Sequence, residues 1–210
     1  RTWSADEPVV LVQKSPEGWL RRGSKPGWVD PVNGRLLVMM GEALLPMDHP
    51  LESMSRGQLY YGVSLDGGQT LAVRELIRQA GDEFTPEHPL PGIWQGRNNA
   101  SYGDRTGRPI RTKAGVVLQP VQMTLPGEDG KPANPGGGYT YMEAAVLMGT
   151  WNEDATRLSW RLSARVANTP AQSSRGAFEP TIAELPDGRI LMVMRGSNTR
   201  TTPGRRWYSM

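Results

Sequence analysis

Two side chains of opposite charge, Glu179 and Arg195, flank a turn signal near the end of the sequence. The turn is Pro186-Asp187-Gly188, and apolar or alternating residues on both sides of it predict a β-hairpin. Each charged residue is about seven or eight positions from the turn, so strand pairing should bring the two together at one sheet edge. A guanidinium there suits bidentate binding of a carboxylate, and a carboxylate there suits accepting a proton. A structural ion pair at the sheet edge is the alternative.

The rest of the chain is rich in strand and turn signals. Its 210 residues include 25 glycines and 18 prolines, too many for a helical bundle. No linker divides the chain, so we expect one domain, with long connections at 41–57, 79–108 and 125–138. The region Leu71–Ala80 also fits a short helix. Short apolar or alternating runs predict strands at Val9–Gln13, Arg35–Met40, Gln58–Ser64, Leu71–Ile77, Ala114–Met123, Thr140–Leu147, Leu158–Val166, Thr181–Leu185, Arg189–Arg195 and Arg206–Met210.

One predicted turn has a distinctive sequence, Ser64-Leu65-Asp66-Gly67-Gly68-Gln69-Thr70-Leu71. In a tight hairpin turn of this kind the Ser and Asp side chains accept backbone N–H groups, and a glycine takes a positive φ. The residue after Thr70, an aromatic in the full pattern, packs beneath the turn. The key positions of the turn are Ser64, Asp66, Gly68 and Thr70.

Other turns extend the pattern into a repeat. Residues 152–160 are a degenerate copy, one residue longer and without the glycine, in which Asp154 and Trp160 hold the Asp and aromatic positions. Arg1–Ser4 resembles the tail of a further copy, and Arg206–Met210 resembles the strand that leads into Ser64. Units of this length with about four strands each are typical of propeller blades.

The eight-residue turn is similar to the Asp-box of sialidase-type propellers, and Glu179–Arg195 resembles the matching hairpin of exo-sialidases and their bacterial relatives. The resemblance implies an all-β fold, about three blades of a six-bladed β-propeller of sialidase type. Residues 1–210 are then expected to be a fragment of a single propeller domain, truncated at both ends. An ordinary β-sandwich with an accidental Asp-Gly turn is the alternative.

The resemblance also implies an activity, the release of a terminal sialic acid or related acidic sugar from a glycan with a retaining mechanism. Glu179 would then polarise a Tyr nucleophile, and Arg195 would be one of three arginines that hold the substrate carboxylate. A Tyr suits this role because the carboxylate of the sugar would repel a carboxylate nucleophile. The nucleophile, the other two arginines and the acid Asp are expected outside residues 1–210, and Tyr139, Tyr141 and Tyr208 are expected to be aromatics packed between blades.

Two further possibilities stay open at this stage. The long connection at 79–108 contains side chains suited to stacking on a sugar and hydrogen-bonding to it, although a loop packing cluster explains them equally well; they are Trp94, Gln95, Arg97 and Asn98. The second possibility is a non-catalytic propeller that binds glycans or proteins through the same blades.

The composition excludes several classes of site. Without cysteine, and with only His49 and His88, each beside a proline, thiolate chemistry and a His-rich metal centre are not expected. A net charge of +3 and the lack of a basic stripe alternating with aromatics argue against nucleic acid as a partner. No apolar run approaches ~18 residues, so no membrane span is expected. The expected mechanism uses side chains alone, hence no cofactor, and the family suggests a secreted or periplasmic location.

Overall fold

The computed structural model describes residues 10–24, 26–45, 56–93, 100–103, 107–138 and 140–210. These residues form strands and loops with no helix, which confirms the all-β class and leaves no helix in the described residues that could cross a membrane. The described strands are β1 (Val10–Ser15), β2 (Gly18–Ser24), β3 (Trp28–Val29), β4 (Leu36–Leu45), β5 (Arg56–Ser64), β6 (Val73–Leu76), β7 (Ala100–Ser101), β8 (Ile110–Arg111), β9 (Val117–Met123), β10 (Glu143–Trp151), β11 (Leu158–Leu162), β12 (Phe178–Glu184), β13 (Ile190–Arg195) and β14 (Arg206–Ser209).

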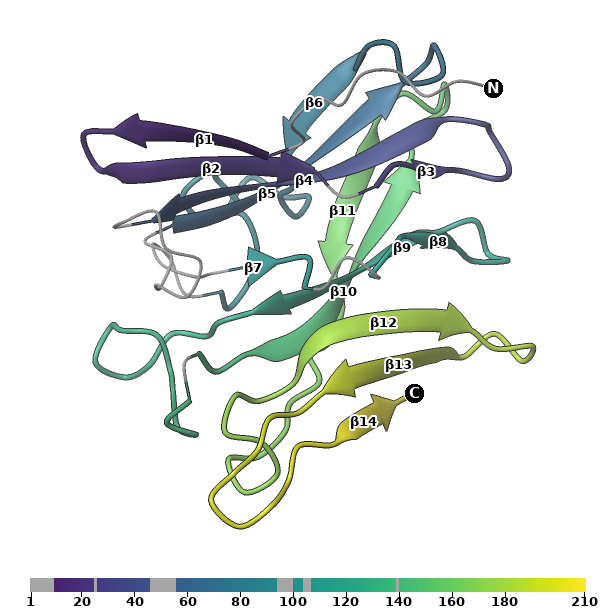
Figure 1. Cartoon of the computed structure of the whole chain (residues 1–210). Coiled ribbons are helices and arrows are strands. Elements are labelled where there is room, and N and C mark those ends of the chain that lie inside the picture. Colours follow the sequence, from purple (N-terminus) through teal and green to yellow (C-terminus); the bar gives the residue numbers. More distant parts are fainter. Residues whose placement is uncertain (1–9, 25, 46–55, 94–99, 104–106, 139) are drawn as a thin grey trace, which may run out of the picture.

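The strands form three antiparallel sheets, none of them closed on itself (Figure 1). The first sheet has the order β1-β2-β4-β5-β6, with β3 paired to β4. The second has the order β11-β10-β9-β7, with β8 paired to β9, and the third has the order β12-β13-β14. Figure 1 shows the sheets one below another, with β4 and β5 above, β9 and β10 in the middle, and β12 to β14 below.

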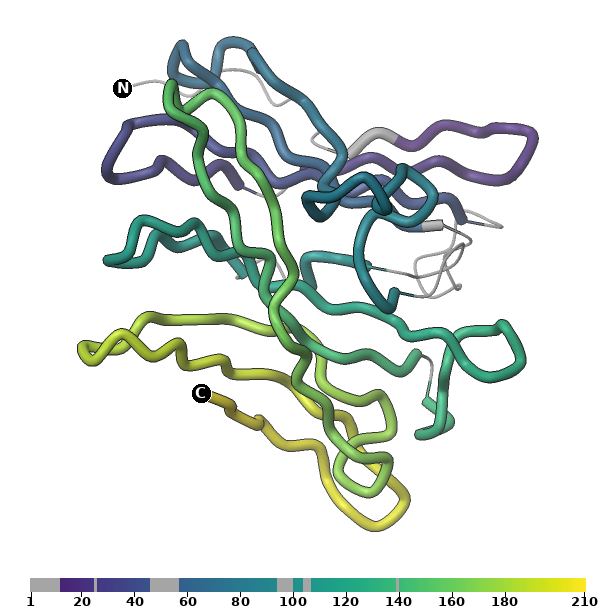
Figure 2. The backbone as a smooth tube through the Cα atoms, turned by 180° about the vertical axis from the view of Figure 1, so that it is seen from behind, coloured from purple at the N-terminus to yellow at the C-terminus, as the bar shows by residue number. Residues whose placement is uncertain are grey.

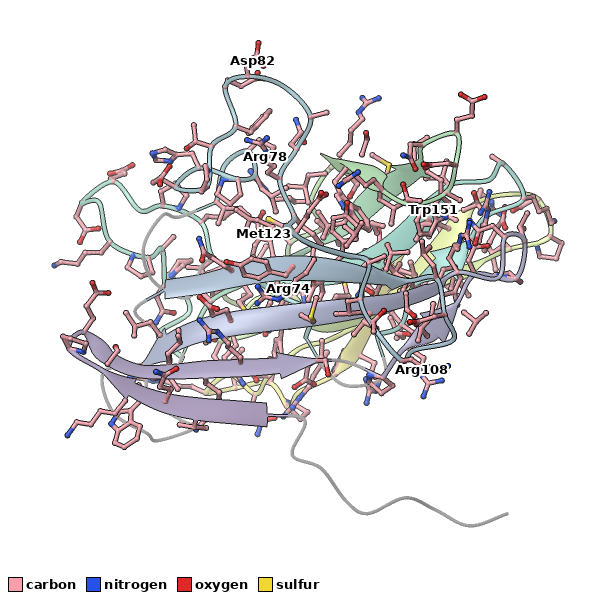
Figure 3. All side chains as sticks on the ribbon, turned by 90° about the horizontal axis from the view of Figure 1, so that it is seen from above. Arg74, Arg78, Asp82, Arg108, Met123 and Trp151 are labelled. Carbon is pink, nitrogen blue, oxygen red and sulfur yellow. The ribbon has the colours of Figure 1, made fainter. Side chains whose placement is uncertain are left out.

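The second sheet is buried on both faces because it packs against both of the others. Along β9, Val117, Val121 and Met123 (labelled in Figure 3) belong to a core shared with the first sheet. The intervening Leu118 belongs to a second core, which Met192 and other residues of the third sheet complete. Successive side chains of a strand point to opposite faces, so one strand serves two cores. Every residue of β9, Gln119 and Gln122 included, is buried for this reason.

A buried ionic cluster joins the first two sheets. Asp30, in the loop after β3, is fully buried, and one of its carboxylate oxygens accepts hydrogen bonds from Arg111 Nη1 at 2.6 Å and Trp151 Nε1 at 2.7 Å. Figure 3 labels Trp151, which comes from β10. The other oxygen accepts the Val32 N–H. Burial opposes ionisation of Asp30, but these hydrogen bonds outweigh it and hold the pKa of the carboxyl below its usual range.

The hairpin of β10 and β11 makes a second connection between sheets. Figure 2 shows this hairpin, in green, running across the back of the molecule. Its second strand begins beside the first sheet, where the Leu158 N–H donates to the hydroxyl of Tyr61 at 3.3 Å and Arg157 pairs with Glu75 at 2.7 Å. The rings of Tyr61 and Trp160 meet edge to face, 5.5 Å apart.

The predicted strands require several corrections. The segment Leu71–Ala80 is not a helix in any part, because β6 pairs with β5 there. The strands β4 and β5 extend into the connection predicted at 41–57, since β4 continues to Leu45 and β5 begins at Arg56. The strand predicted at Thr140–Leu147 is displaced to Glu143–Trp151, and β11 ends at Leu162, although Val166 still bridges to Ala144. The sequence analysis missed β2, β3, β7 and β8.

Candidate functional site

The hairpin of β12 and β13 brings Glu179 and Arg195 together, as the turn between them predicts. The turn closes with the Leu185 N–H donating to the Arg189 carbonyl at 2.8 Å, and Gly188 takes φ 85°. At the other end of the hairpin, Phe178 and Arg195 are paired across the strands. Arg195 Nη1 lies 3.1 Å from Glu179 Oε1 and 3.2 Å from Oε2, so one guanidinium nitrogen faces both carboxylate oxygens.

Glu179 lies in an irregular part of its strand. The register of β12 against β13 shifts between Phe178 and Thr181, which marks a β-bulge. Glu179 has φ 51°, a left-handed conformation that residues other than glycine rarely adopt. Its N–H donates to Oε1 of Gln122, a nearly buried side chain of β9, at 2.6 Å. The bulge and this hydrogen bond aim the carboxylate out of the sheet toward Arg195.

The close approach of β9 and β12 here depends on Gly103. A β-carbon at that position would lie 3.1 Å from Glu179 Cα and 3.3 Å from Pro180 Cδ. Gly103 itself has φ 66°, so a side chain would be both crowded and strained. The backbone beside the carboxylate is therefore held from the side of β9 as well as from its own hairpin.

Two arginine side chains lie on the ring of Phe178. The guanidinium carbon of Arg175 is 4.4 Å from the ring centroid, and that of Arg195 is 5.1 Å from it. Arg175 also donates from Nη2 to Thr140 Oγ1 at 3.1 Å. The phenylalanine is itself buried, so it gives both cations a fixed apolar support and a favourable cation–π contact.

A pocket of about 600 Å³ opens beside these arginines. This volume is in the range of sites for small ligands. Its lining combines four arginines with small and polar residues and contains no carboxylate side chain among the described residues: Gly138, Ser174, Arg175, Arg195, Gly196, Ser197, Asn198, Gly204, Arg205 and Arg206. The pocket is therefore strongly electropositive, and Glu179 supplies the nearby negative charge through its contact with Arg195.

Hydrogen bonds between loops hold the walls of the pocket. Ser174 Oγ donates to the Asn198 carbonyl at 2.5 Å, and the Ser197 N–H donates to Ser173 Oγ at 2.9 Å. On the other side, the Gly138 N–H donates to the Ser174 carbonyl at 3.1 Å. A β-carbon on Gly138 would lie 2.6 Å from that carbonyl oxygen, so only glycine permits the contact. Three loops distant in sequence thus form one wall.

The turn at Ser64–Leu71 has the hydrogen bonds that its sequence predicts. Ser64 Oγ accepts the Gly68 N–H at 2.8 Å, and Asp66 Oδ1 accepts the Thr70 N–H at 3.0 Å. Hydrogen bonds from the Thr70 side chain and backbone lower the pKa of Asp66 well below its usual range. Gly68 has φ 97°. The turn links β5 to β6 and lies outside the arginine pocket, so its residues are structural.

The degenerate copy at 152–160 achieves a similar turn with different residues. Asn152 Oδ1 accepts the N–H of Thr156 at 2.9 Å, while Asp154 Oδ1 accepts the Thr156 hydroxyl at 2.6 Å. The missing glycine is replaced by Ala155, which takes φ 53°. Trp160 is buried in the core shared by the first and second sheets.

A tyrosine–glutamate pair elsewhere in the chain is not suited to nucleophilic chemistry. Tyr61 donates to Glu75 Oε2 at 2.6 Å, but the tyrosine is 1% exposed in the core. Burial, and then the hydrogen bond to Glu75, raise the pKa of the Tyr61 hydroxyl well above its usual value. This pair stabilises the contact between β5 and the start of β11.

The structure describes some, but not all, of the loop residues and tyrosines named in the sequence analysis. Trp94, Gln95, Arg97 and Asn98 lie outside the described residues, as does Tyr139. Tyr141 is buried and donates to the Asn168 carbonyl, whereas Tyr208 is largely exposed on β14, contrary to the expected packing between blades. No group of three or more His, Cys, Asp or Glu side chains suited to a metal ion occurs in the described part of the chain.

Sequence reasoning missed Arg175, Arg205, Arg206 and Gln122. Arg175 and Arg205 neighbour glycines, at Gly176 and Gly204, which is a signal for loops that approach one another closely. Comparison with protein-family models gives no match. Comparison with curated proteins gives no match either, so the functional argument depends on the geometry of this chain.

Proposed function

We propose that the protein is a glycoside hydrolase of exo-sialidase type, which releases a terminal sialic acid or related acidic sugar from a glycan. The observation that carries the proposal is the Glu179–Arg195 pair, held on a strained bulge beside an arginine-lined pocket of about 600 Å³. Strained residues cluster at functional sites, where the surrounding structure maintains them. An ion pair with no role beyond stability would not need a left-handed glutamate.

We also propose that the three sheets are successive blades of a six-bladed propeller. Each Asp-box-like turn joins the last two strands of its sheet, β5 to β6 in the first and β10 to β11 in the second. In the third sheet β12, β13 and β14 correspond to the three strands that precede such a turn. Neighbouring sheets pack face to face through separate cores, which is the packing that propeller blades require.

In the proposed mechanism Arg195 binds the carboxylate of the sugar with its planar guanidinium. Glu179 accepts the proton of a tyrosine, which attacks the anomeric carbon as the glycosidic bond breaks and the acid Asp protonates the leaving oxygen. Water then attacks the same carbon and gives a proton to the Asp, while the released tyrosine takes its proton back from Glu179, so that the configuration is retained. Among the described residues no tyrosine hydroxyl contacts Glu179. The mechanism further requires a tyrosine nucleophile, an acid Asp and two more arginines to reach this pocket. No cofactor takes part.

The test uses Glu179→Gln and Arg195→Lys in the full-length protein, assayed with a fluorogenic sialoside. Glu179→Gln should lower kcat by ~100- to 10,000-fold, because Gln keeps the shape but cannot act as a base. Arg195→Lys should weaken binding of a carboxylate-bearing inhibitor by ~2–5 kcal/mol, about 30-fold to several thousandfold. Calorimetry measures this binding, and thermal unfolding checks that both variants are folded.

Matched controls exist on the same hairpin. Glu184→Gln, at the far end of β12, and Arg189→Lys, at the turn, should leave kcat and inhibitor binding unchanged. Unchanged kcat in Glu179→Gln with a lowered melting temperature would reject the catalytic role. Inhibitor binding by wild-type protein with no turnover of any sialoside would instead indicate the second candidate, a glycan-binding propeller, which needs only the arginine pocket.

A further inference from the structure

The arginine pocket contains more positive charge than one carboxylate of a substrate would offset. Four arginines line it, of which Arg195, Arg205 and Arg206 come from β13, β14 and the loop between them. Within the described residues, Glu179 is the one acidic side chain that contacts any of these three, through its ion pair with Arg195. Arg195 forms this ion pair with Glu179, yet half of its side chain stays exposed to solvent. With a substrate carboxylate at Arg195, no acidic side chain among the described residues would pair with Arg205 or Arg206.

The arrangement of the strands makes this excess costly. Arg195 of β13 and Arg206 of β14 are direct cross-strand partners, so their side chains leave the same face of the sheet. Like charges directly opposite one another destabilise a strand pair. Arg205 precedes Arg206, and its carbonyl accepts the Gly196 N–H at 2.8 Å, so the end of the hairpin is closed where the cations gather. An anion bound between the guanidinium groups of Arg195 and Arg206 would offset this repulsion.

Arg175 brings a further guanidinium from a different loop to the same place. Its contact with Phe178, which it shares with Arg195, and its hydrogen bond to Thr140 fix its position against the pocket. Guanidinium groups from two separate loops therefore line one open pocket, in which Arg195, Arg205 and Arg206 are exposed to solvent. Arginine at such a site favours planar or tetrahedral oxyanions, which accept two parallel hydrogen bonds.

The pocket also adjoins a second hollow of about 610 Å³. The two share Gly138, Ser174 and Asn198, and the second adds one more cation, Arg200. A ligand larger than one sugar would therefore extend from the first pocket into the second without meeting an acidic side chain among the lining residues.

We infer that the ligand of this pocket is an acidic saccharide with two anionic groups, a carboxylate at Arg195 and a second anion at Arg175, Arg205 and Arg206. The inference rests on the proposed function, since the first anion is the carboxylate of the substrate sugar. The second anion is either a sulfate ester on the same sugar or the carboxylate of a neighbouring acidic sugar. Both sources present the same chemistry to the arginines.

The experiment measures calorimetric binding of three probes to the full-length protein. The probes are N-acetylneuraminic acid, its 8-O-sulfate ester, and a sulfur-linked α2,8 disialic acid that resists hydrolysis. Wild-type protein should bind at least one doubly anionic probe about ten- to a hundredfold more tightly than the single sugar, the range expected for one added charge-assisted contact. The probe that gains identifies the source of the second anion.

Variants then locate the second anion. Arg205→Gln and Arg206→Gln should each weaken binding of the doubly anionic probe about tenfold more than binding of the single sugar. Both residues are exposed, so these variants should fold, and thermal unfolding checks this. Arg189→Gln, at the opposite end of the hairpin, is the matched control and should change neither affinity.

The outcomes separate this inference from the proposed function. Equal affinities for all three probes, with Arg195→Lys still weakening each of them, would overturn the second anion and leave the acidic-sugar site intact. Equal losses for single and doubly anionic probes in Arg206→Gln would overturn it as well. No binding of any probe would reject the proposed function itself.

Discussion

The strain at Glu179 makes a prediction whose sign is unusual: replacing this residue with glycine should stabilise the protein relative to replacing it with alanine. Glu179 has φ 51°. A left-handed conformation costs a non-glycine residue roughly 1–2 kcal/mol, and alanine bears this cost as glutamate does. Glycine avoids the cost but raises the entropy of the unfolded chain, which offsets ~0.4–1 kcal/mol. The net difference should be about 0.5–1 kcal/mol in favour of Glu179→Gly.

The comparison between the two variants removes the ion pair from the calculation. Both lose the contact with Arg195, which is partly exposed and therefore worth ~0–1 kcal/mol. Urea unfolding of the two variants at pH 7 measures the difference from the midpoints at a common slope. Thermal unfolding should show Glu179→Gly melting ~1–4 °C above Glu179→Ala. Both variants should lose turnover.

Glu184 on the same strand provides the matched control. Its φ is not positive, and its carboxylate accepts the Lys113 N–H at 2.9 Å. Glycine in an ordinary strand position is less stable than alanine by roughly 0.5–1 kcal/mol, so the sign should reverse in Glu184→Gly against Glu184→Ala. If Glu179→Gly is no more stable than Glu179→Ala, the backbone at residue 179 is not strained, and the argument from strain to function fails.

Three further predictions concern stability away from the pocket. Ala155→Gly should raise the free energy of unfolding by about 0.5–1 kcal/mol in urea titrations without affecting turnover, because Ala155 has φ 53°; a loss of stability would contradict this. Asp30→Asn should lower it by about 2–3 kcal/mol at pH 7, since Arg111 loses a buried partner. The pKa of Asp30 is lowered in the folded state, so the stability that its ionised carboxylate contributes is present above about pH 4 and is lost as the pH falls. Asp30→Asn should therefore flatten the acid side of a plot of stability against pH, and an unchanged acid side would refute this role. Ser64→Ala should cost about 0.5–1.5 kcal/mol by removing the buried hydroxyl that accepts the Gly68 N–H, and a melting temperature equal to wild type would show that the turn does not depend on it.

The sequence predicts the parts of the fold where local pattern and burial agree. The hairpin from Phe178 to Arg195 has a turn with one dominant conformation and strands of apolar or alternating residues, so its register follows from counting. The strand β9 lies within the strand predicted at Ala114–Met123, although it contains the polar residues Gln119 and Gln122. The sequence therefore predicts the hairpin of β12 and β13, and the strand β9, close to their observed positions.

The missed strands have weaker local signals. In β2 the residues Trp19, Leu20, Arg21 and Arg22 neither alternate nor form an apolar run, and the strand exists because it pairs with both β1 and β4. The short strands β3, β7 and β8 each have two residues, and only their partners in neighbouring sheets define them. Such pairings are decided by tertiary contacts, which a local pattern does not encode.

The site was predictable only along one hairpin. Glu179 and Arg195 are linked by a turn, so their proximity follows from the sequence. Arg175 and Arg205 reach the same pocket from other loops, through contacts between backbone segments that no spacing rule describes. Gln122 is a polar residue in an apolar strand, and its role as acceptor for the Glu179 N–H depends on the close approach of β9 and β12.

At Glu179 the conformation that the local sequence favours differs from the one that the backbone adopts. A residue before proline is pushed toward an extended conformation, so the sequence Glu179-Pro180 favours a regular strand at that point. The structure has a left-handed residue there instead, and it is maintained by the hydrogen bond to Gln122, the buried ring of Phe178 and the space left by Gly103. Natural sequences mostly agree with their fold at every level, and the disagreements that persist are expected where function requires them. Gln122 of β9 and Gly103 after β7 accommodate the backbone of Glu179 in a conformation that its own sequence disfavours, and its carboxylate pairs with Arg195, which lines the arginine pocket. A requirement to place the carboxylate there explains why the strain persists.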